Sequence, residues 1–273
     1  MKLSVIIVNY KTPDKLDKCI SSLKKCNPEI DDVIIIDNDS GDESLDVVRK
    51  KFPDAKIVAS RINGGLARAI NWGFNYAKYD TILSLNPDVI VTENAIQKLY
   101  DHLEKEDGIG LIAPKLLNED GSLQYSCYEY YRFMTPFYRR TTLGKLSFAK
   151  KELERFEMRE WDHDSPRDVG WAIGAVFMTR RDTIKKIGPM DERYFLYFED
   201  VDLCRRLWES GYRVVYYPEA EMYHELKRES YMNSGISSFF NNLTRIHFQS
   251  WMKYLVKNRG KLDVSYKKQG KDS

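Results

Sequence analysis

The chain has few cysteines, no long apolar run and only four histidines among its 273 residues. No 18-residue apolar window occurs, and the apolar run after the initial Met is too short for a signal peptide, so we expect neither a spanning helix nor secretion. No C-x-x-C pair is present, which argues against a thiolate metal centre or a disulfide framework. We therefore expect a cytoplasmic protein whose thiols stay reduced: Cys19, Cys26, Cys127 and Cys204.

An excess of one charge is also lacking, because 43 Lys and Arg nearly balance 41 Asp and Glu. The balance is uneven along the chain: from Leu226 onward, ten Lys and Arg stand against three Asp and Glu. Such a basic end either contacts phosphates or the inner face of an anionic membrane, or only keeps the chain soluble. Nucleic-acid binding is not expected, because the basic residues gather at one end without an interleaved stacking motif.

The first half of the chain alternates apolar runs with amphipathic segments. The apolar runs predict buried strands at Leu3–Asn9, Asp32–Asp37, Lys56–Ala59 and Thr81–Leu85, separated by segments of helical spacing. Strands that are apolar throughout indicate an α/β fold, with a Rossmann-like, mostly parallel central sheet flanked by helices. Ligands of such sheets bind beyond the carboxyl ends of the strands, so the loops that follow them are the place to look for a site.

Two of these loops suit a nucleotide. Asp37-Asn38-Asp39-Ser40 is either a turn with a helix cap or a set of acceptors for a pyrimidine base or a ribose. Asn63-Gly64-Gly65 precedes a helix that carries Arg68, and glycines before a helix N-terminus can admit a diphosphate. Alone, this second signal is weak, because it matches no phosphate-binding motif.

The loop Asn86-Pro87-Asp88 has two interpretations of nearly equal weight. It is either a turn that ends a strand, since Pro breaks the ladder and Asn and Asp suit turns, or a ligand site for a divalent ion. Mg²⁺ and Mn²⁺ bind through one or two carboxylates together with substrate phosphates, and Asp88 would be that carboxylate.

The stretch from Asp191 to Arg206 crowds acids at a junction between an apolar segment and a helix. Glu199, Asp200 and Asp202 either complement the helix dipole or form a site, and crowded carboxylates raise one another's pKa, as a general base requires. His224 is a candidate ligand further on, although a lone histidine is more often structural.

Two regions depart from the alternating pattern. Residues 123–165 lose periodicity and are rich in Tyr and Arg, which predicts a functional insertion or lid. Residues 230–256 have helical spacing and precede a basic tail. This C-terminal helical appendage could cover the sheet, form a homodimer contact or lie on a membrane. The expected organisation is a catalytic domain at 1–225, with a nucleotide-binding half at 1–115 and an acceptor half at 116–225, followed by the C-terminal region at 226–273.

Seven motifs in order resemble glycosyltransferase family 2, over roughly residues 2–256. They are SVIIVNYK, IIIDNDSGD, NGGLARAINWG, LSLNPDV, VGWAIGAVFMTRR, MDERYFLYFEDVDLCRRL and a later His. Within the family, the chain is most similar to the rhamnosyltransferase-like branch of bacterial surface-polysaccharide synthesis. The resemblance implies a GT-A fold and an inverting sugar transfer, dependent on Mn²⁺ or Mg²⁺, from a nucleotide-diphosphate sugar to a glycan or polyprenyl-diphosphate-linked acceptor.

The resemblance also implies roles for individual residues. Asp200 would be the general base, with Glu199 and Asp202 as supporting acids, while Asp88 and His224 would bind the metal. Asn86 stands where many members of the family carry a first Asp. The remaining residues would contact the nucleotide sugar (Asn9, Tyr10, Asp37, Asp39, Arg68, Asn86) or line the sugar and acceptor cleft (Trp171, Gly174, Asp191, Glu192, Arg206).

The expected donor is dTDP-L-rhamnose. Two alternatives stay open: a family 2 transferase that uses a UDP-hexose, and a non-catalytic nucleotide-sugar-binding subunit of a polysaccharide assembly. Retention of Asp88 together with Glu199, Asp200 and Asp202 argues against the second, because a binding module needs no general base.

Overall fold

The computed structural model describes residues 1–27, 29–225, 242–262, 264 and 266. The strands are β1 (Leu3–Asn9), β2 (Asp32–Asp37), β3 (Lys56–Ala59), β4 (Thr81–Leu85), β5 (Val89–Val91), β6 (Ile109–Leu117), β7 (Leu123–Gln124), β8 (Cys127–Tyr128), β9 (Arg167–Asp168), β10 (Trp171–Ala172), β11 (Val176–Arg180) and β12 (Arg213–His224). The helices are α1 (Pro13–Cys26), α2 (Ser44–Lys51), α3 (Leu66–Tyr76), α4 (Ala95–Lys105), α5 (Thr135–Arg140), the 3₁₀ helix η1 (Thr142–Lys145), α6 (Ser147–Phe156), α7 (Arg181–Ile187), α8 (Glu199–Glu209) and α9 (Asn242–Lys257).

One sheet carries most of the strands, in the order β3-β2-β1-β4-β11-β6-β12-β5. The first four strands of this order are parallel, as the sequence predicts, and β12 runs parallel to β6. Two strands run against the others: β11 is antiparallel to β4 and β6, and β5 is antiparallel to β12. The expected α/β architecture with a mostly parallel central sheet is confirmed.

Helices cover both faces of the sheet, because the strand side chains alternate between two apolar clusters. Val5 and Ile7 of β1 pack in one cluster with residues of α1 and α4, whereas Ile6 and Val8 pack in the other with residues of α3 and α8. With both faces buried, the strands expose mainly their ends. A ligand therefore has to meet the loops there.

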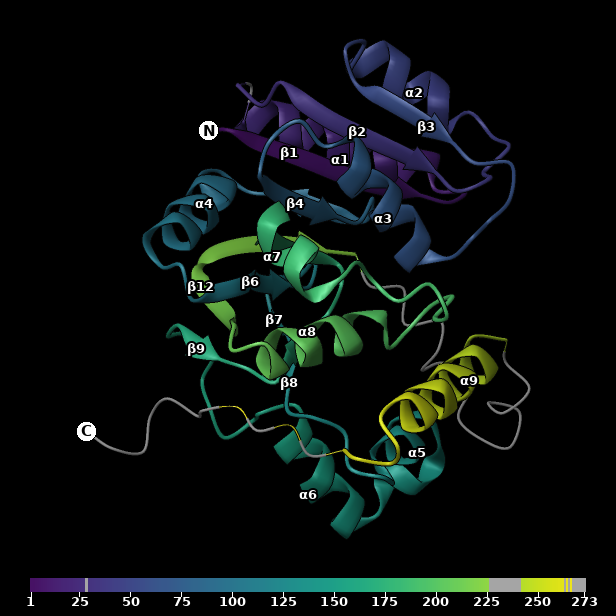
Figure 1. The fold of residues 1–273 in the computed structure, drawn as a ribbon, viewed down its shortest axis with the longest axis vertical. Helices are drawn as coiled ribbons and strands as arrows, with labels where there is room; N and C mark the ends of the chain where they lie inside the picture. The colour runs from purple at the N-terminus through teal and green to yellow at the C-terminus, as the bar shows by residue number, and fades with distance from the viewer. Residues whose placement is uncertain (28, 226–241, 263, 265, 267–273) are drawn as a thin grey trace.

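The predicted insertion is built into the core instead of forming a loose lid. Tyr128 and Tyr131 lie against Phe156 of α6 and against Trp171 of β10, with ring centroids 4.5–5.7 Å apart. Trp251 of α9 joins this aromatic cluster, 5.8 Å from Tyr131. Figure 1 shows α5, α6 and α9 together at the end of the molecule opposite α2 and β3.

The C-terminal helix packs on the body of the chain, which was one of three options open from the sequence. In α9, Trp251 and Tyr254 are buried, and Ser250 Oγ donates to the Leu196 carbonyl at 2.9 Å. The helix begins at Asn242, and the part of the expected helical region at 230–241 lies outside the described residues, as do Lys267 and Lys268 of the tail. No helix in the described part of the chain is long and apolar enough to cross a membrane.

Candidate active site

The loops after β1 and β2 hold a buried carboxylate. Asn9 Nδ2 donates to Asp37 Oδ1 at 3.1 Å and to Ser40 Oγ at 3.0 Å, and the Ser40 N–H donates to Asp37 Oδ2 at 3.1 Å. Because each carboxylate oxygen has further lone pairs, Asp37 can still accept from a ligand. Tyr10 and Asp39 are exposed beside it, and Asp39 has a left-handed backbone with φ of 68°. The predicted nucleotide-binding residues of these two loops are thus brought together.

A second link joins this pair to the glycine loop. Asn38 Nδ2 donates to Asn63 Oδ1 at 2.9 Å, while the Gly64 N–H donates to Asn38 Oδ1 at 3.0 Å. Arg68, on the first turn of α3, lies with its guanidinium over the Trp72 ring, 5.1 Å from the centroid. Arg68, the cation expected to bind a diphosphate, therefore lies in the first turn of α3. The backbone N–H groups of that turn also favour an anion.

The glycine loop is also fixed to the acid-rich segment. The Leu66 N–H donates to the Phe195 carbonyl at 3.0 Å, and Gly65 has φ of 87°. A Cβ added at Gly65 would stand 2.4 Å from that carbonyl oxygen. Further along α3, Asn71 Nδ2 donates to the Met190 carbonyl and to Glu192 Oε1, at 2.9 and 3.0 Å. These contacts join the glycine loop and α3 to the segment that precedes α8.

Replacing Gly65 by Ala should therefore destabilise the fold by about 2–4 kcal/mol, because a left-handed backbone and a backbone clash combine. Gly121→Ala is the matched control, since Gly121 has φ of 81° but nothing within 4 Å of an added Cβ. It should cost only about 1 kcal/mol. Chemical denaturation of both variants makes the comparison, and equal losses would contradict the close approach.

The loop after β4 brings Asp88 to His224. The antiparallel pairing of β5 with β12 places His224 opposite Val89, and His224 Nε2 lies 3.4 Å from Asp88 Oδ1. On the other side of the ring, His224 Nδ1 lies 2.6 Å from Gln124 Oε1. Gln124 is oriented by its own amide, whose Nε2 donates to the carbonyl of His224 and to Asn118 Oδ1. Since Gln124 Oε1 can only accept, Nδ1 must carry a proton, and in the neutral ring Nε2 has a lone pair.

A cation is thus favoured between Asp88 and His224. Asp88 Oδ1 is buried without a hydrogen-bond partner among the described residues. Lys15 of α1 supplies one positive charge, with its Nζ 3.6 Å from Asp88 Oδ2 and 3.8 Å from Glu225 Oε2. Burial by itself would raise the pKa of Asp88, but His224 and Lys15 outweigh it and hold the pKa below its usual value. Asp88 is therefore ionised, and its Oδ1 faces Nε2 of His224.

These two side chains fit a divalent ion that completes its shell with substrate oxygens. Within the described residues, no three His, Cys, Asp or Glu side chains come together closely enough to hold an ion. Asp88 offers an unpartnered oxygen, and His224 offers Nε2 with its other nitrogen bound to Gln124. That second contact is typical of metal-binding histidines. One carboxylate plus phosphate oxygens is a common set for Mg²⁺ and Mn²⁺.

Asp200 lies at the N-terminus of α8 and is held by two backbone N–H groups. The Gly174 N–H donates to Oδ2 at 3.1 Å and the Val201 N–H to Oδ1 at 2.8 Å. Burial raises the pKa of Asp200, although these N–H groups and the charge of Arg139 act in the opposite direction. Tyr197 and Phe198 just before it have φ of 66° and 70°, a strained pair that fixes where the helix begins. The outcome is an oriented carboxylate of raised proton affinity.

The three acids do not form one cluster, which differs from the crowding expected from the sequence. Glu199 is buried beside Asp200, and burial, followed by repulsion from Asp200, raises the pKa of Glu199 well above its usual value. Asp202 instead takes part in ion pairs, with Arg206 Nε at 2.9 Å and Lys257 Nζ of α9 at 2.6 Å. Because an α-helix has 3.6 residues per turn, Asp200 and Asp202, two positions apart, face opposite sides of α8.

Asp191 and Arg206 also belong to the structural part of this segment. Lys257 Nζ lies 2.7 Å from Asp191 Oδ2, and Arg193 pairs with the same carboxylate at 2.6 Å. Burial opposes the change, yet these two cations lower the pKa of Asp191 far below its usual value. Arg206 donates to the carbonyls of residues 187–189 at 2.8–3.0 Å. Both residues therefore fix the loop before Asp200 and the helix after it.

Trp171, which the sequence placed in the sugar and acceptor cleft, is buried among aromatic side chains. Its side chain is 3% exposed, stacks on Tyr128 and donates from Nε1 to the Glu129 carbonyl at 3.1 Å. The sequence suggested a direct contact with sugar, but the aromatic residues of the insertion cover the ring. Gly174, in contrast, contacts Asp200 through its backbone N–H.

The candidate metal loop and the candidate base are connected through the start of β11. The Asn86 N–H donates to the Ala175 carbonyl at 2.8 Å, and the neighbouring Gly174 binds Asp200. Asn86 thus acts through its backbone here. Sequence reasoning included Asn38 in a candidate loop but missed Lys15 and Gln124, which belong to no recognisable motif.

Comparison with known proteins places this chain in a family. N-acetylglucosaminyl-diphospho-decaprenol L-rhamnosyltransferase of Mycobacterium tuberculosis (strain CDC 1551 / Oshkosh) is 27% identical over 241 residues, covering 81% of this chain and 75% of that protein. Rhamnosyltransferase WbbL of Escherichia coli (strain K12) is 25% identical over 264 residues, covering 93% of each chain.

The fold is similar to that of solved GT-A glycosyltransferases. The crystal structure of GalNAc-T7 with UDP, GalNAc and Mn²⁺ superposes with a TM-score of 0.65 at 16% sequence identity. The match covers 93% of this chain and 47% of that one, so this chain spans about half the length of its structural neighbour. The family model for glycosyl transferase family 2 matches residues 4–188. The chain belongs to glycosyl transferase family 2.

Proposed function

We propose that this chain is an inverting glycosyltransferase that moves L-rhamnose from dTDP-L-rhamnose to a polyprenyl-diphosphate-linked glycan in surface-polysaccharide synthesis. The observation that carries the proposal is Asp200, an oriented carboxylate of raised pKa. It accepts a hydrogen bond from the Gly174 N–H, and the neighbouring Ala175 carbonyl accepts one from the Asn86 N–H. The sugar follows the names of the two rhamnosyltransferase relatives, and the acceptor follows the name of the mycobacterial one. The dTDP carrier follows the resemblance to the rhamnosyltransferase-like branch.

Each group of candidate site residues has a role in the proposed transfer. Asp37 accepts hydrogen bonds from the base or ribose, and Arg68 with the N-terminus of α3 meets the diphosphate. Asp200 takes the proton of the acceptor hydroxyl while that oxygen attacks the anomeric carbon, and the bond to the nucleotide diphosphate breaks on the opposite face. Asp88 and His224 would hold a divalent ion, which neutralises negative charge on the leaving diphosphate when bound.

A UDP-hexose donor is the second candidate, because the structural neighbour GalNAc-T7 was solved with UDP and GalNAc. A transfer assay separates the two. The purified chain is incubated with Mn²⁺, a polyprenyl-diphosphate-linked N-acetylglucosamine acceptor and either dTDP-L-rhamnose or a UDP-hexose. The masses of the lipid products are then measured by mass spectrometry. We expect a deoxyhexose to be added from dTDP-L-rhamnose. Addition only of a hexose would favour the second candidate, and binding without any turnover would favour a non-catalytic subunit.

A further inference from the structure

Residues 132–151, from the start of α5 into α6, form a surface unlike the rest of the chain, which we call the insertion surface. This stretch contains six basic residues and no Asp or Glu: Arg132, Arg139, Arg140, Lys145, Lys150 and Lys151. Other stretches of twenty or more residues also lack an acid, but no other twenty-residue stretch without an acid holds more than five basic residues. The first acid beyond it, Glu152, is turned back to pair with Arg132 and Arg155, at 2.9 and 2.6 Å.

The same stretch exposes large apolar side chains. Phe133 and Phe148 are 59% and 61% exposed, while Met134, Leu143 and Leu146 are 38–44% exposed. Of the twelve large hydrophobic residues exposed among the described ones, these five lie within sixteen positions of one another in the sequence. Scattered exposed hydrophobics need no explanation, but a group within one short segment indicates an interaction surface.

The insertion surface stands on a fixed base. Thr135 is buried and donates from Oγ1 to Glu152 Oε1 at 2.6 Å, while the Arg132 N–H donates to Thr135 Oγ1 at 3.0 Å. Phe137 of α5 lies 4.9 Å from Phe248 of α9. Exposed aromatic residues on such a base are held outward by the packing of the elements beneath them.

Arg139 points in the other direction, toward the candidate active site. Arg139 donates from Nη1 to the Tyr131 hydroxyl at 2.9 Å and stacks over Tyr128 and Phe156. Its charge is among the influences that lower the pKa of Asp200. The insertion surface therefore borders the candidate base on its inner side.

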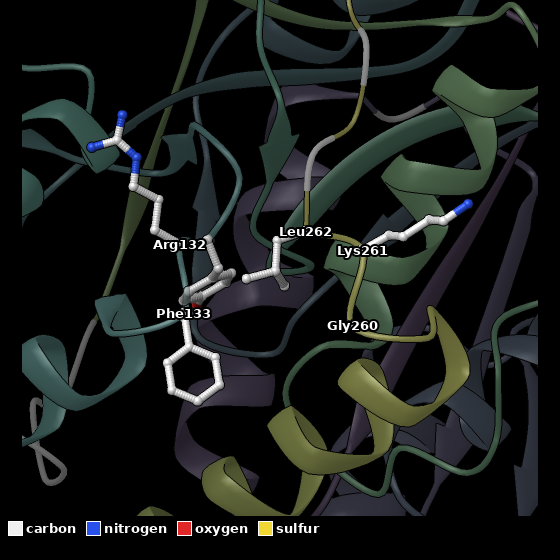
Figure 2. Close-up of a pocket in the computed structure, with 6 residues that line it drawn as sticks. Arg132, Phe133, Gly260, Lys261 and Leu262 are labelled. Carbon is white, nitrogen blue, oxygen red and sulfur yellow. The ribbon is translucent and has the colours of Figure 1, made fainter.

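A cavity of about 490 Å³ opens at the edge of this surface, between the insertion and the segment after α9. It is lined by Tyr131, Arg132, Phe133, Gly260, Lys261 and Leu262. Figure 2 shows Leu262 near Phe133, with Arg132 and Lys261 extending to opposite sides. None of the residues predicted for the donor site lines it. This edge thus repeats the composition of the surface, with apolar side chains flanked by cations.

We infer that the insertion surface docks the enzyme on an anionic lipid bilayer. Exposed Phe and Leu enter the boundary between headgroups and acyl chains, and surrounding Lys and Arg attract anionic headgroups, which is how interfacial segments bind membranes. The inference deepens the proposed function, on which it rests for its purpose: a docked insertion would bring Asp200 to an acceptor anchored in the same membrane. It differs from the sequence-based expectation, which assigned membrane contact to the basic C-terminus.

Flotation with vesicles tests the inference without any sugar transfer. The full chain is mixed with vesicles of phosphatidylcholine alone or with added phosphatidylglycerol, which contain neither donor nor acceptor. We expect flotation only with the anionic vesicles, and the variant L146E/F148E should reduce the bound fraction by about tenfold or more. Replacing Lys145 and Lys150 by Gln should weaken the partition coefficient by about fivefold for each lysine. Thermal melting of each variant checks that these exposed positions leave the fold intact.

Val256→Glu is the matched control, because Val256 is an exposed apolar residue on α9, 75% exposed and outside the insertion surface. Its flotation should equal that of the wild type. Unchanged flotation of L146E/F148E, or a loss with Val256→Glu alone, would overturn the inference. Sedimentation without vesicles supplies the other contrary outcome: a dimer that L146E/F148E dissociates would assign this surface to a second copy of the chain. Since no catalysis is measured, failure here leaves the proposed transfer to be judged by its own assay.

Discussion

Asp200→Asn should lower the rate of sugar transfer by about a thousandfold while leaving donor affinity within about twofold. The amide keeps the shape of the carboxylate but cannot take the proton of the acceptor hydroxyl. The amide oxygen can accept from one of the two N–H groups that bind the native carboxylate, those of Gly174 at 3.1 Å and Val201 at 2.8 Å, and this remaining bond should keep the start of α8 in place. Single-turnover kinetics and donor titration on the same preparation measure the two quantities.

Glu199→Gln is the control for this variant, because burial and the neighbouring Asp200 raise the pKa of Glu199 well above its usual value. Because the raised pKa favours the neutral form of Glu199, an amide of the same shape should replace it at little cost. We therefore expect Glu199→Gln to keep most of the activity. If this variant were inactive and Asp200→Asn active, the two acids would exchange roles.

The pH dependence of the wild type follows from the same direction of shift. A general base acts in its deprotonated form, so activity is lost as the pH falls through the folded-state pKa of the base. Since burial raises the pKa of Asp200, this loss should occur at a higher pH than for an exposed Asp.

Asp88→Ala should weaken Mn²⁺-dependent donor binding by about 100-fold, the second large effect that the structure predicts. The substitution removes the buried oxygen that faces His224 Nε2 at 3.4 Å. Donor titration by calorimetry, with Mn²⁺ and with a chelator, measures the change. The difference between the two conditions should be large for the wild type and should vanish for the variant.

Glu225→Gln is the matched control for Asp88→Ala. Glu225 lies in the same cluster, but its carboxylate contacts Lys15 at 3.8 Å and no contact with His224 is found for it. It should retain the Mn²⁺ dependence of the wild type. Equal loss in both variants would show that local negative charge, and not a ligand, is what matters at this loop.

The strands were predictable because their physics is local. A continuous apolar run flanked by turn residues indicates a buried parallel strand, and β1, β2, β3 and β4 have the bounds that the sequence suggests. Once the strands are parallel, their carboxyl ends meet at one edge, which brings Asn9 and Asp37 together. Helix ends were harder: Thr12–Lys25 has helical spacing, whereas α1 begins at Pro13 and ends at Cys26, one residue later at each end.

The parts that escaped prediction depend on contacts between distant residues. Lys15 reaches Glu225 across 210 positions, and Gln124 reaches His224 across 100, so neither contact leaves a local pattern. Val169–Thr179 is strand-like in sequence, but the fold has two strands there, β10 and β11, with Gly174 between them turning its N–H to Asp200. The insertion lacks helical periodicity since its helices are short and its aromatics pack on Trp171 and Trp251.

The site residues were identified as types of chemistry before their surroundings were known. The segment with Asp191, Asp202 and Arg206 has the composition of a catalytic segment. In the fold, however, Asp202 pairs with Arg206, and Lys257 of α9 pairs with both Asp191 and Asp202. Sequence cannot separate an acid that pairs with a cation from one that stays available. The distinction depends on α9, which approaches this segment only in the folded chain.

The anomeric configuration of the transfer product tests the central claim most directly. A single displacement with Asp200 as base must place the acceptor oxygen on the face opposite the departing diphosphate. NMR of the purified product, compared with the nucleotide-sugar donor, reports the configuration at the anomeric carbon. The structure predicts inversion. Retention would require two successive displacements, and would contradict the role assigned to Asp200.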